Sequence, residues 1–161
     1  MIKRIIIEGP DCSGKSTVVE RIKNMLHWDS KSLHHIEGDQ FERYLKEYAN
    51  NLNTVFDRSH ISEIVYSILW NRANPFSPDE QKMLNDICNN KVLIIFVCPD
   101  IEVIKSRYLN RKFEQQISFN ELEKSREIFI EVMGKLPFLL YQSKDYEELD
   151  SLLKSVREII N

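Results

Sequence analysis

One short segment near the start of the chain restricts the fold more than any other. Residues 9–17 read GPDCSGKST, which fits the phosphate-binding pattern G-x-x-x-x-G-K-[S/T]. The segment follows the apolar run Ile5–Ile7, which predicts a buried strand, and precedes a helical pattern that begins at Lys15. A strand, a glycine loop and a helix in this order predict that the chain binds the phosphates of a nucleoside triphosphate.

The residue types within the loop suit this chemistry. Gly9 and Gly14 let the backbone turn tightly and bring its N–H groups close to phosphate oxygens. Lys15 supplies a positive charge for the β- and γ-phosphates, and the hydroxyl of Ser16 suits Mg²⁺. The cofactors expected are therefore ATP and Mg²⁺, and the predicted nucleotide-binding residues are Gly9, Asp11, Cys12, Ser13, Gly14, Lys15, Ser16 and Thr17.

Length, charge and cysteine usage narrow the class of protein. The chain has 161 residues, which fits a single domain over residues 1–161. A net charge of −3 argues against stable nucleic-acid binding and against binding to membrane surfaces. Three widely spaced cysteines indicate free thiols. No signal-peptide pattern is present, and no apolar run approaches the length of about 20 residues that a membrane span needs. We expect a cytoplasmic protein. The sequence leaves open whether the protein forms a homodimer.

Apolar runs typical of strands alternate with helical patterns along the chain. Strands are predicted at residues 3–8, 33–36, 53–57, 92–97 and 138–142. Helices are predicted at residues 15–26, 40–49, 61–69, from 77 onward, 101–111, 120–135 and 149–160. This alternation predicts an α/β fold whose parallel sheet carries helices on both faces. Ligands of such sheets bind beyond the carboxyl ends of the strands.

A second motif stands where the third predicted strand ends. Asp57 can hold a Mg²⁺-bound water or accept a proton there, and Arg58 can grip a substrate phosphate through two hydrogen bonds. The alternative is an aspartate that caps the next helix and pairs with the arginine. On that helix Ser62, Tyr66 and Trp70 are spaced by four and share one face. This face suits a phosphorylated sugar and a base, with ordinary packing as the alternative.

Two arginines follow the fourth predicted strand. Arg107 and Arg111 are like charges four residues apart, an arrangement that is mildly unfavourable on an isolated helix. A transferring phosphoryl group would offset their repulsion, so we expect both arginines to act in catalysis from a short lid at about residues 107–118. A solvated basic helix face is the alternative.

Together these motifs resemble the thymidylate kinase and deoxynucleoside kinase group of P-loop kinases. The resemblance spans about residues 3 to 160 and rests on residues 7–17, residues 57–59 with Ser62 and Tyr66 after them, and residues 96–100 with Arg107 and Arg111. The chain is short and its lid lacks the glycine and acidic pattern of cellular thymidylate kinases. It is therefore similar to a compact, phage-type member.

The resemblance implies a fold and a set of roles. It implies the P-loop kinase fold, with five parallel strands and the loop-bearing strand in the centre. Asp11 would contact the sugar 3′-hydroxyl, Arg58 the 5′-phosphate of the acceptor, and Tyr66 the deoxyribose or base. Arg107 and Arg111 would stabilise charge on the transferred phosphoryl group.

The leading functional prediction is transfer of the ATP γ-phosphoryl group to a deoxypyrimidine 5′-monophosphate such as dTMP. The first alternative is phosphorylation of a nucleoside 5′-hydroxyl, with Asp57, Glu8 or Glu37 as the base. Residues 36–39 read IEGD, without the aromatic residue that nucleoside kinases place after the glutamate, and this favours the monophosphate. Weaker alternatives are a polynucleotide 5′-kinase and a GTPase-type switch that acts on a protein partner.

Overall fold

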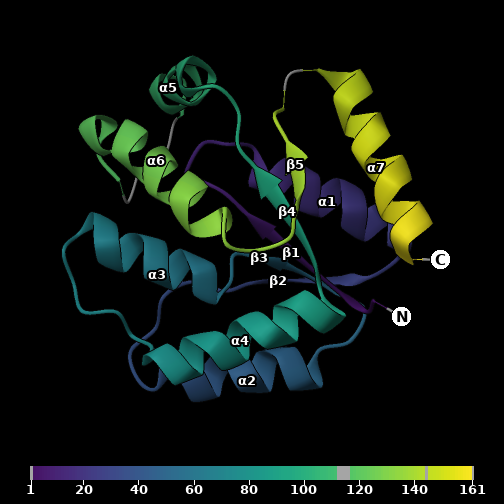
Figure 1. Cartoon of the computed structure of the whole chain (residues 1–161). Coiled ribbons are helices and arrows are strands. Elements are labelled where there is room, and N and C mark those ends of the chain that lie inside the picture. The colour runs from purple at the N-terminus through teal and green to yellow at the C-terminus, as the bar shows by residue number, and fades with distance from the viewer. Residues whose placement is uncertain (1, 112–116, 144, 161) are drawn as a thin grey trace.

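Five parallel strands form one sheet in the middle of the molecule (Figure 1). The computed structural model describes residues 2–111, 117–143 and 145–160. Across the sheet the strand order is β2-β3-β1-β4-β5, so the strand that leads into the glycine loop is central. The strands are β1 (Arg4–Glu8), β2 (Asp29–Ser32), β3 (Thr54–Asp57), β4 (Leu93–Val97) and β5 (Leu139–Tyr141). The α/β fold class and the parallel, five-stranded sheet are confirmed.

Helices cover both faces of this sheet. Figure 1 shows α1 and α7 on one side and the helices from α2 to α6 on the other. The helices are α1 (Lys15–Leu26), α2 (Gln40–Asn50), α3 (His60–Leu69), α4 (Pro78–Lys91), α5 (Ile101–Leu109), α6 (Leu122–Met133) and α7 (Tyr146–Ile160), with a 3₁₀ turn at Phe119–Glu121. Within the described ranges, no helix is long and apolar enough to cross a membrane.

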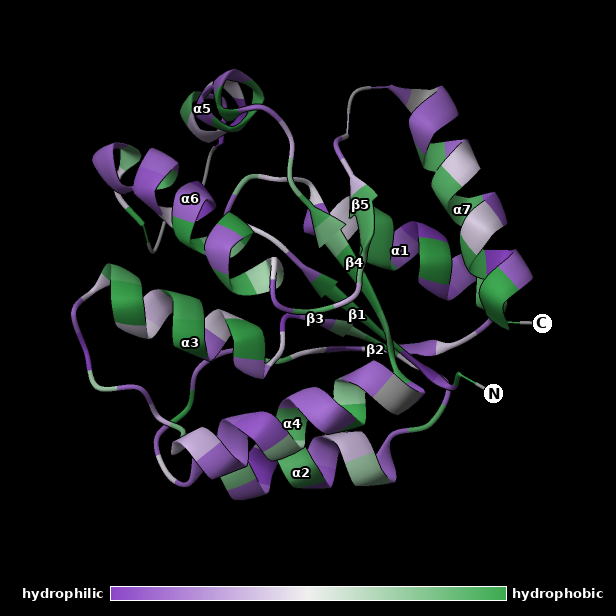
Figure 2. Cartoon of the chain, viewed as in Figure 1, coloured by the Kyte–Doolittle hydropathy of each residue, from purple (hydrophilic) through white to green (hydrophobic). Residues whose placement is uncertain are grey.

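The core consists of two apolar layers, one on each side of the sheet. Side chains of a strand alternate between the faces, so Ile5 and Ile7 of β1 pack against α1 and α7, whereas Ile6 packs toward α3 and α6. Because both faces are buried, the central strands are continuously apolar rather than alternating. Figure 2 shows the central strands in green, whereas the helices around them carry both green and purple residues. The sheet therefore holds the carboxyl end of β1 in a rigid, buried frame.

The second strand differs from the prediction. It lies at Asp29–Ser32, not at residues 33–36, and all four of its residues are exposed. An edge strand that is open to solvent does not need apolar residues, so its sequence carries no hydrophobic signal. The buried Leu33 misled the prediction: it follows the strand, and its backbone N–H donates to the carbonyl oxygen of Asp57 over 3.0 Å.

Several helix ends also differ. The helix predicted at 101–111 ends at Leu109, so Arg111 stands beyond it and the two arginines do not share a helix face. The helix predicted at 120–135 divides into the 3₁₀ turn and α6. By contrast, the predicted start at Ser77 is confirmed: its hydroxyl accepts from the Glu80 backbone N–H, and the Glu80 carboxylate accepts from the Ser77 N–H.

A buried histidine joins three helices beneath the sheet. His60 is fully buried at the start of α3. Its Nε2 lies 3.0 Å from Asn85 Oδ1 of α4, and its Nδ1 lies 2.9 Å from the hydroxyl of Tyr48 on α2. The neutral ring with its proton on Nε2 satisfies both contacts, because the amide oxygen accepts and the tyrosine hydroxyl donates. Burial lowers the pKa of His60 to about 4.

This burial predicts an acid-dependent loss of stability. In the unfolded chain His60 takes up a proton near pH 6.5, whereas in the folded chain it stays neutral until pH falls to about 4. The unfolded state binds more protons between these values, so the free energy of unfolding falls by about 3 kcal/mol as pH drops through this window. Urea unfolding of wild type and His60→Gln between pH 7 and pH 4 measures the effect. Equal pH slopes for the two proteins would contradict it.

Candidate active site

The glycine loop wraps around the ammonium group of Lys15. Gly9 (φ 150°), Cys12 (φ 62°) and Gly14 (φ 101°) have positive φ angles, which turn the chain sharply between β1 and α1. Lys15 Nζ donates to the carbonyl oxygens of Gly9 (2.9 Å) and Pro10 (2.7 Å). Burial, followed by the positive charge of Arg58, lowers the pKa of Lys15 to about 8. The loop therefore holds a desolvated cation directly beneath its backbone.

Gly9 has no room for a side chain. A β-carbon at this position would overlap the carbonyl oxygen of Val97, and its φ of 150° is one that other residues rarely adopt. We expect Gly9→Ala to lower the free energy of unfolding by about 3 kcal/mol. Gly38→Ala is the matched control, because Gly38 also has a positive φ but nothing lies within 4 Å of the added carbon. That variant should lose only about 1 kcal/mol in the same denaturant titration. An equal loss of unfolding free energy in both variants would contradict the clash with Val97.

Three predicted substrate residues meet beside the loop. Arg58 forms an ion pair with Asp11 through Nη2 and donates from Nη1 to the Tyr66 hydroxyl over 3.0 Å. That hydroxyl in turn donates to Asp11 Oδ2 over 3.2 Å. Burial alone would raise the pKa of Asp11, but the charges of Arg58 and Lys15 hold it below its ordinary value. The loop, the end of β3 and α3 are thereby joined through one charged network.

The backbone directs Arg58 into this network. Arg58 has a left-handed φ of 76°, and its N–H donates to the carbonyl oxygen of Ile7 over 3.1 Å. It stands between the end of β3 and Ser59, which caps α3 by accepting from the N–H of Ile61. A tight turn between strand and helix therefore aims the guanidinium at the loop.

Glu8 occupies the space beneath this turn. It is fully buried, and its carboxylate accepts from the hydroxyls of Ser59 (2.6 Å) and Ser62 (2.7 Å) and from the Ser62 N–H. Burial raises its pKa, although both serines and the nearby cations act in the opposite direction. Glu8 therefore anchors α3 to β1. The Ser62 hydroxyl, predicted to bind substrate, is used in this anchor.

A small cavity opens next to the charged network, and we call it the acceptor cavity. It has a volume of 40 Å³ and is lined by Leu33, His34, His35, Arg58, Ser62, Glu63, Tyr66, Trp70 and Arg72. Trp70 stacks on Tyr66 with ring centroids 5.0 Å apart, and Arg72 lies 4.7 Å above the Trp70 ring. His35 contacts the buried Glu63 over 2.8 Å. The cavity thus combines aromatic faces with two arginines.

Sequence reasoning predicted no substrate role for five of the residues that line this cavity. These are Leu33, His34, His35, Glu63 and Arg72, and the two histidines lie in a loop rather than in the predicted strand. One signal was present, since Glu63 is a charged residue among the apolar positions of α3. Its burial reflects partners on α2 and in the loop before it, which the sequence does not place nearby.

A larger cavity lies on the other side of the loop, and we call it the nucleotide cavity. It has a volume of 420 Å³ and is lined by Cys12, Gly14, Thr17, Arg107, Asn110, Arg111, Tyr141 and Ser143. Arg107 reaches across from α5 and donates to the carbonyl oxygen of Ser13 (2.6 Å) and to the Ser143 hydroxyl (2.8 Å). Both predicted lid arginines therefore border the loop. Residues 112–116 of the predicted lid lie outside the described residues.

The two predicted metal-binding residues fit Mg²⁺. Ser16 is exposed at the first turn of α1. Asp57 pairs in register with Ile7 of β1, which brings its carboxylate next to the loop. Its Oδ1 is buried and has no hydrogen-bond donor among the described residues. A buried carboxylate oxygen without a donor is suited to a cation or its bound water.

Comparison with known proteins yields relatives in sequence and in structure. No protein-family model matches the chain. An SPbeta prophage-derived uncharacterized protein of Bacillus subtilis (strain 168), YorR, is 28% identical over 140 residues, which cover 81% of this chain and 81% of that protein. The crystal structure of Bacillus subtilis YorR in complex with phosphorylated GDP has a TM-score of 0.79 at 23% identity, covering 98% of this chain and 95% of that one.

Solved kinase structures share the same architecture. Deoxyadenosine kinase from M. mycoides, with the products dCMP and dCDP bound, has a TM-score of 0.69 at 16% identity, over 97% of this chain and 99% of that one. Thymidylate kinase from Candida albicans has a TM-score of 0.63 at 19% identity, covering 99% of this chain and 91% of that one. The chain therefore has the P-loop kinase fold, and this fold resembles that of deoxynucleoside and thymidylate kinases.

Proposed function

We propose that the protein transfers the γ-phosphoryl group of ATP to a deoxynucleoside 5′-monophosphate, with dTMP as the leading acceptor. The observation that carries this proposal is the position of Arg58. Its guanidinium lines the acceptor cavity next to the loop, and Arg72 adds a second guanidinium to the same wall. Guanidinium groups recognise phosphates through paired, charge-assisted hydrogen bonds. An acceptor that carries a phosphate suits this wall better than a neutral nucleoside does.

The charged network supplies the roles of the individual residues. Arg58 exchanges its bond to Asp11 for the acceptor phosphate, and the released Asp11 carboxylate accepts from the sugar 3′-hydroxyl. The stacked Tyr66 and Trp70 rings offer a flat apolar surface to the sugar and base. An acceptor phosphate oxygen then forms a bond to the γ-phosphorus while the bond from that phosphorus to the β–γ bridging oxygen breaks, and ADP leaves.

The loop and the arginines of the nucleotide cavity stabilise this transfer. Lys15 and the backbone N–H groups of the loop bind the β- and γ-phosphates. Arg107 and Arg111 border the same cavity and balance the charge on the transferred group. Ser16 and Asp57 would hold Mg²⁺, which would supply positive charge to the phosphates. The protein residues need only position the reactants and stabilise charge, which is the main source of catalysis in phosphoryl transfer.

A nucleoside 5′-hydroxyl is the second candidate acceptor, and one observation favours it. Asp57 has a buried oxygen to which no described residue donates a hydrogen bond, as expected of a base that takes the proton of a hydroxyl nucleophile. Glu8 does not fit this role because its carboxylate is enclosed by two serines. Between the two acceptors, the presence of both Arg58 and Arg72 in the acceptor cavity favours the monophosphate.

A phosphoryl-transfer screen tests the proposal. ATP and Mg²⁺ are supplied with nucleosides, with nucleoside 5′-monophosphates and with a 5′-hydroxyl oligonucleotide. Turnover with dTMP or a related monophosphate is the expected result. The screen includes dGMP and GMP because YorR was solved with a guanine nucleotide. Turnover with these two alone would mean that the acceptor is a purine monophosphate and not a pyrimidine monophosphate. Turnover restricted to nucleosides would move the reaction to the 5′-hydroxyl, with Asp57 as the base.

A further inference from the structure

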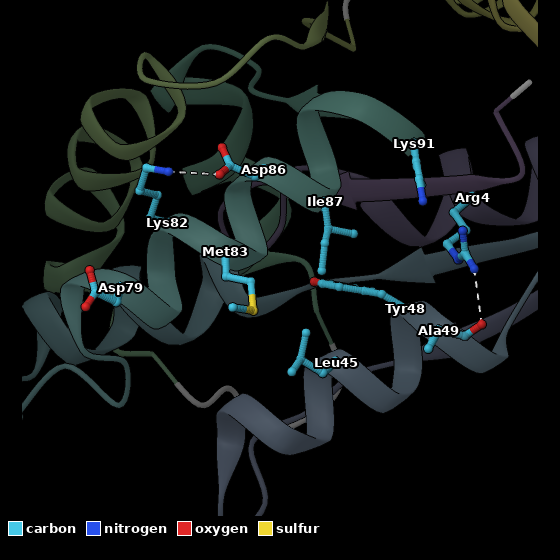
Figure 3. Close-up of a pocket in the computed structure, with 10 residues that line it drawn as sticks. All are labelled: Arg4, Leu45, Tyr48, Ala49, Asp79, Lys82, Met83, Asp86, Ile87 and Lys91. Atoms are coloured by element: carbon cyan, nitrogen blue, oxygen red, sulfur yellow. Dashed lines mark hydrogen bonds and ion pairs between the residues drawn. The ribbon is translucent and has the colours of Figure 1, made fainter.

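A large cavity lies away from the loop, between α2 and α4 (Figure 3). We call it the helix-pair cavity. It has a volume of 930 Å³ and is lined by Arg4, Leu45, Tyr48, Ala49, Asp79, Lys82, Met83, Asp86, Ile87 and Lys91. Pockets that bind small molecules commonly have volumes of about 300–1,000 Å³ and an apolar lining with a few polar groups. By size and composition this cavity belongs to that class.

The cavity lies at the opposite edge of the sheet from the active site. Arg4 is the first residue of β1, whereas the glycine loop follows the last residue of that strand. None of the residues that line the helix-pair cavity borders the acceptor cavity or the nucleotide cavity. A ligand bound here would therefore not compete directly with either substrate of the proposed reaction.

One end of the cavity carries two cationic side chains, Arg4 and Lys91, and neither forms an ion pair with a residue that the structure describes. Arg4 is more than nine-tenths buried, and its Nε has no hydrogen-bond partner among the described residues. The same guanidinium makes one weak contact, from Nη2 to the Ala49 carbonyl oxygen over 3.3 Å. The parallel register Ile5–Leu93 brings Lys91, two residues before Leu93, to the same end of the sheet. Figure 3 shows Arg4 and Lys91 together at this end.

The rest of the cavity is mostly apolar and carries three further charged side chains, Asp79 and the ion-paired Lys82 and Asp86. Leu45, Met83 and Ile87 project into its middle from α2 and α4 (Figure 3). Met83 is half exposed, so an apolar side chain faces an opening and not the core. Lys82 is paired with Asp86 over 3.2 Å. The lining therefore offers an apolar trough whose cationic end, at Arg4 and Lys91, lies opposite the end that carries Asp79 (Figure 3).

We propose that the helix-pair cavity binds a small molecule with an apolar body and a single anionic head, which is a carboxylate, sulfonate or phosphate. The head would pair with the guanidinium of Arg4 and the ammonium of Lys91, and the body would cover Met83, Leu45 and Ile87. A largely buried guanidinium without an anionic partner is unfavourable. An anion beside Arg4 and Lys91 reduces that cost, and this charge complementarity selects an anionic over a neutral or cationic ligand.

Two matched fluorescent probes test this inference. The first is 8-anilinonaphthalene-1-sulfonate, and the second is N-phenyl-1-naphthylamine, which has the same aromatic body without the sulfonate. We expect wild type to bind one equivalent of the sulfonate. Lys91→Gln should weaken that binding about tenfold, since a charge-assisted contact is lost, and should leave the affinity for the neutral amine unchanged. Lys91 is exposed, so this variant avoids the folding risk of changing the buried Arg4.

Further variants locate the probe. Met83→Glu places a carboxylate in the trough and should abolish binding of both probes. Lys154→Gln removes an exposed lysine of α7 far from the cavity and should change nothing. Sulfonate binding that survives both Lys91→Gln and Met83→Glu would overturn the inference. Displacement of the bound sulfonate by ATP and Mg²⁺ would also overturn it, because the probe would then occupy the nucleotide cavity.

Discussion

Replacing Lys15 by alanine is expected to lower kcat for phosphoryl transfer by about a thousandfold. Lys15 is the one cation held within the glycine loop itself, and its ammonium already sits on the loop carbonyls of Gly9 and Pro10. Without it, the charge that develops on the β- and γ-phosphates during transfer loses its nearest fixed partner. Steady-state rates with saturating ATP, Mg²⁺ and dTMP measure the effect.

Folding should not account for this loss. Burial lowers the pKa of Lys15 to about 8, which means that the fold disfavours its charged form and gains little stability from it. The thermal midpoint of Lys15→Ala should therefore equal or exceed that of wild type. Lys23→Ala is the matched control, because Lys23 lies in the same helix and pairs only with the exposed Glu20. A kcat of Lys15→Ala within fivefold of wild type would remove the loop from the mechanism.

Replacing Arg58 by glutamine is expected to weaken binding of the acceptor monophosphate by about a hundredfold, since at least one charge-assisted bond to phosphate is lost. Binding of ATP should stay near the wild-type value, because Arg58 does not line the nucleotide cavity. Isothermal titration with dTMP and, separately, with a non-hydrolysable ATP analogue measures both affinities.

Binding of thymidine, which lacks the 5′-phosphate of dTMP, distinguishes the loss of a phosphate contact from a rearranged cavity. Arg58 also holds Asp11 and Tyr66, so its loss could rearrange the wall. If Arg58 binds the phosphate, Arg58→Gln should weaken dTMP and leave thymidine unchanged. A rearranged cavity would weaken both ligands alike, and that outcome would contradict the assigned role. Tyr66→Phe, which keeps the ring but removes the hydroxyl, should change the dTMP affinity by less than about tenfold.

The central part of the fold was predictable because local patterns and long-range packing agree there. Continuous apolar runs predict strands that are buried on both faces, and Ile5–Ile7 behaves in this way. The capping box at Ser77 and Glu80 sets a helix start from four residues alone. By contrast, β2 is an exposed edge strand with the sequence DSKS, and it forms because β3 offers it backbone partners. No pattern within those residues encodes that pairing.

The candidate site was predictable wherever strand ends bring motifs together. The rule that parallel strands present their carboxyl ends at one edge placed Asp57 and Arg58 near the loop, and the structure brings Arg58 into contact with Asp11. The hydrogen-bond partners of Glu8 were not predictable in this way. Its two serines lie more than fifty positions further along the chain, and only the folded turn after β3 brings them together.

The left-handed backbone at Arg58 has a consequence for how this protein would change under selection. A positive φ is unfavourable for arginine, whereas glycine or asparagine adopts it readily. Either replacement would relax the turn but remove the guanidinium. Either replacement would also leave the largely buried Asp11 without its ion pair, which costs more stability than the relaxed turn returns. Selection for heat resistance would therefore retain arginine at position 58 despite its strained backbone.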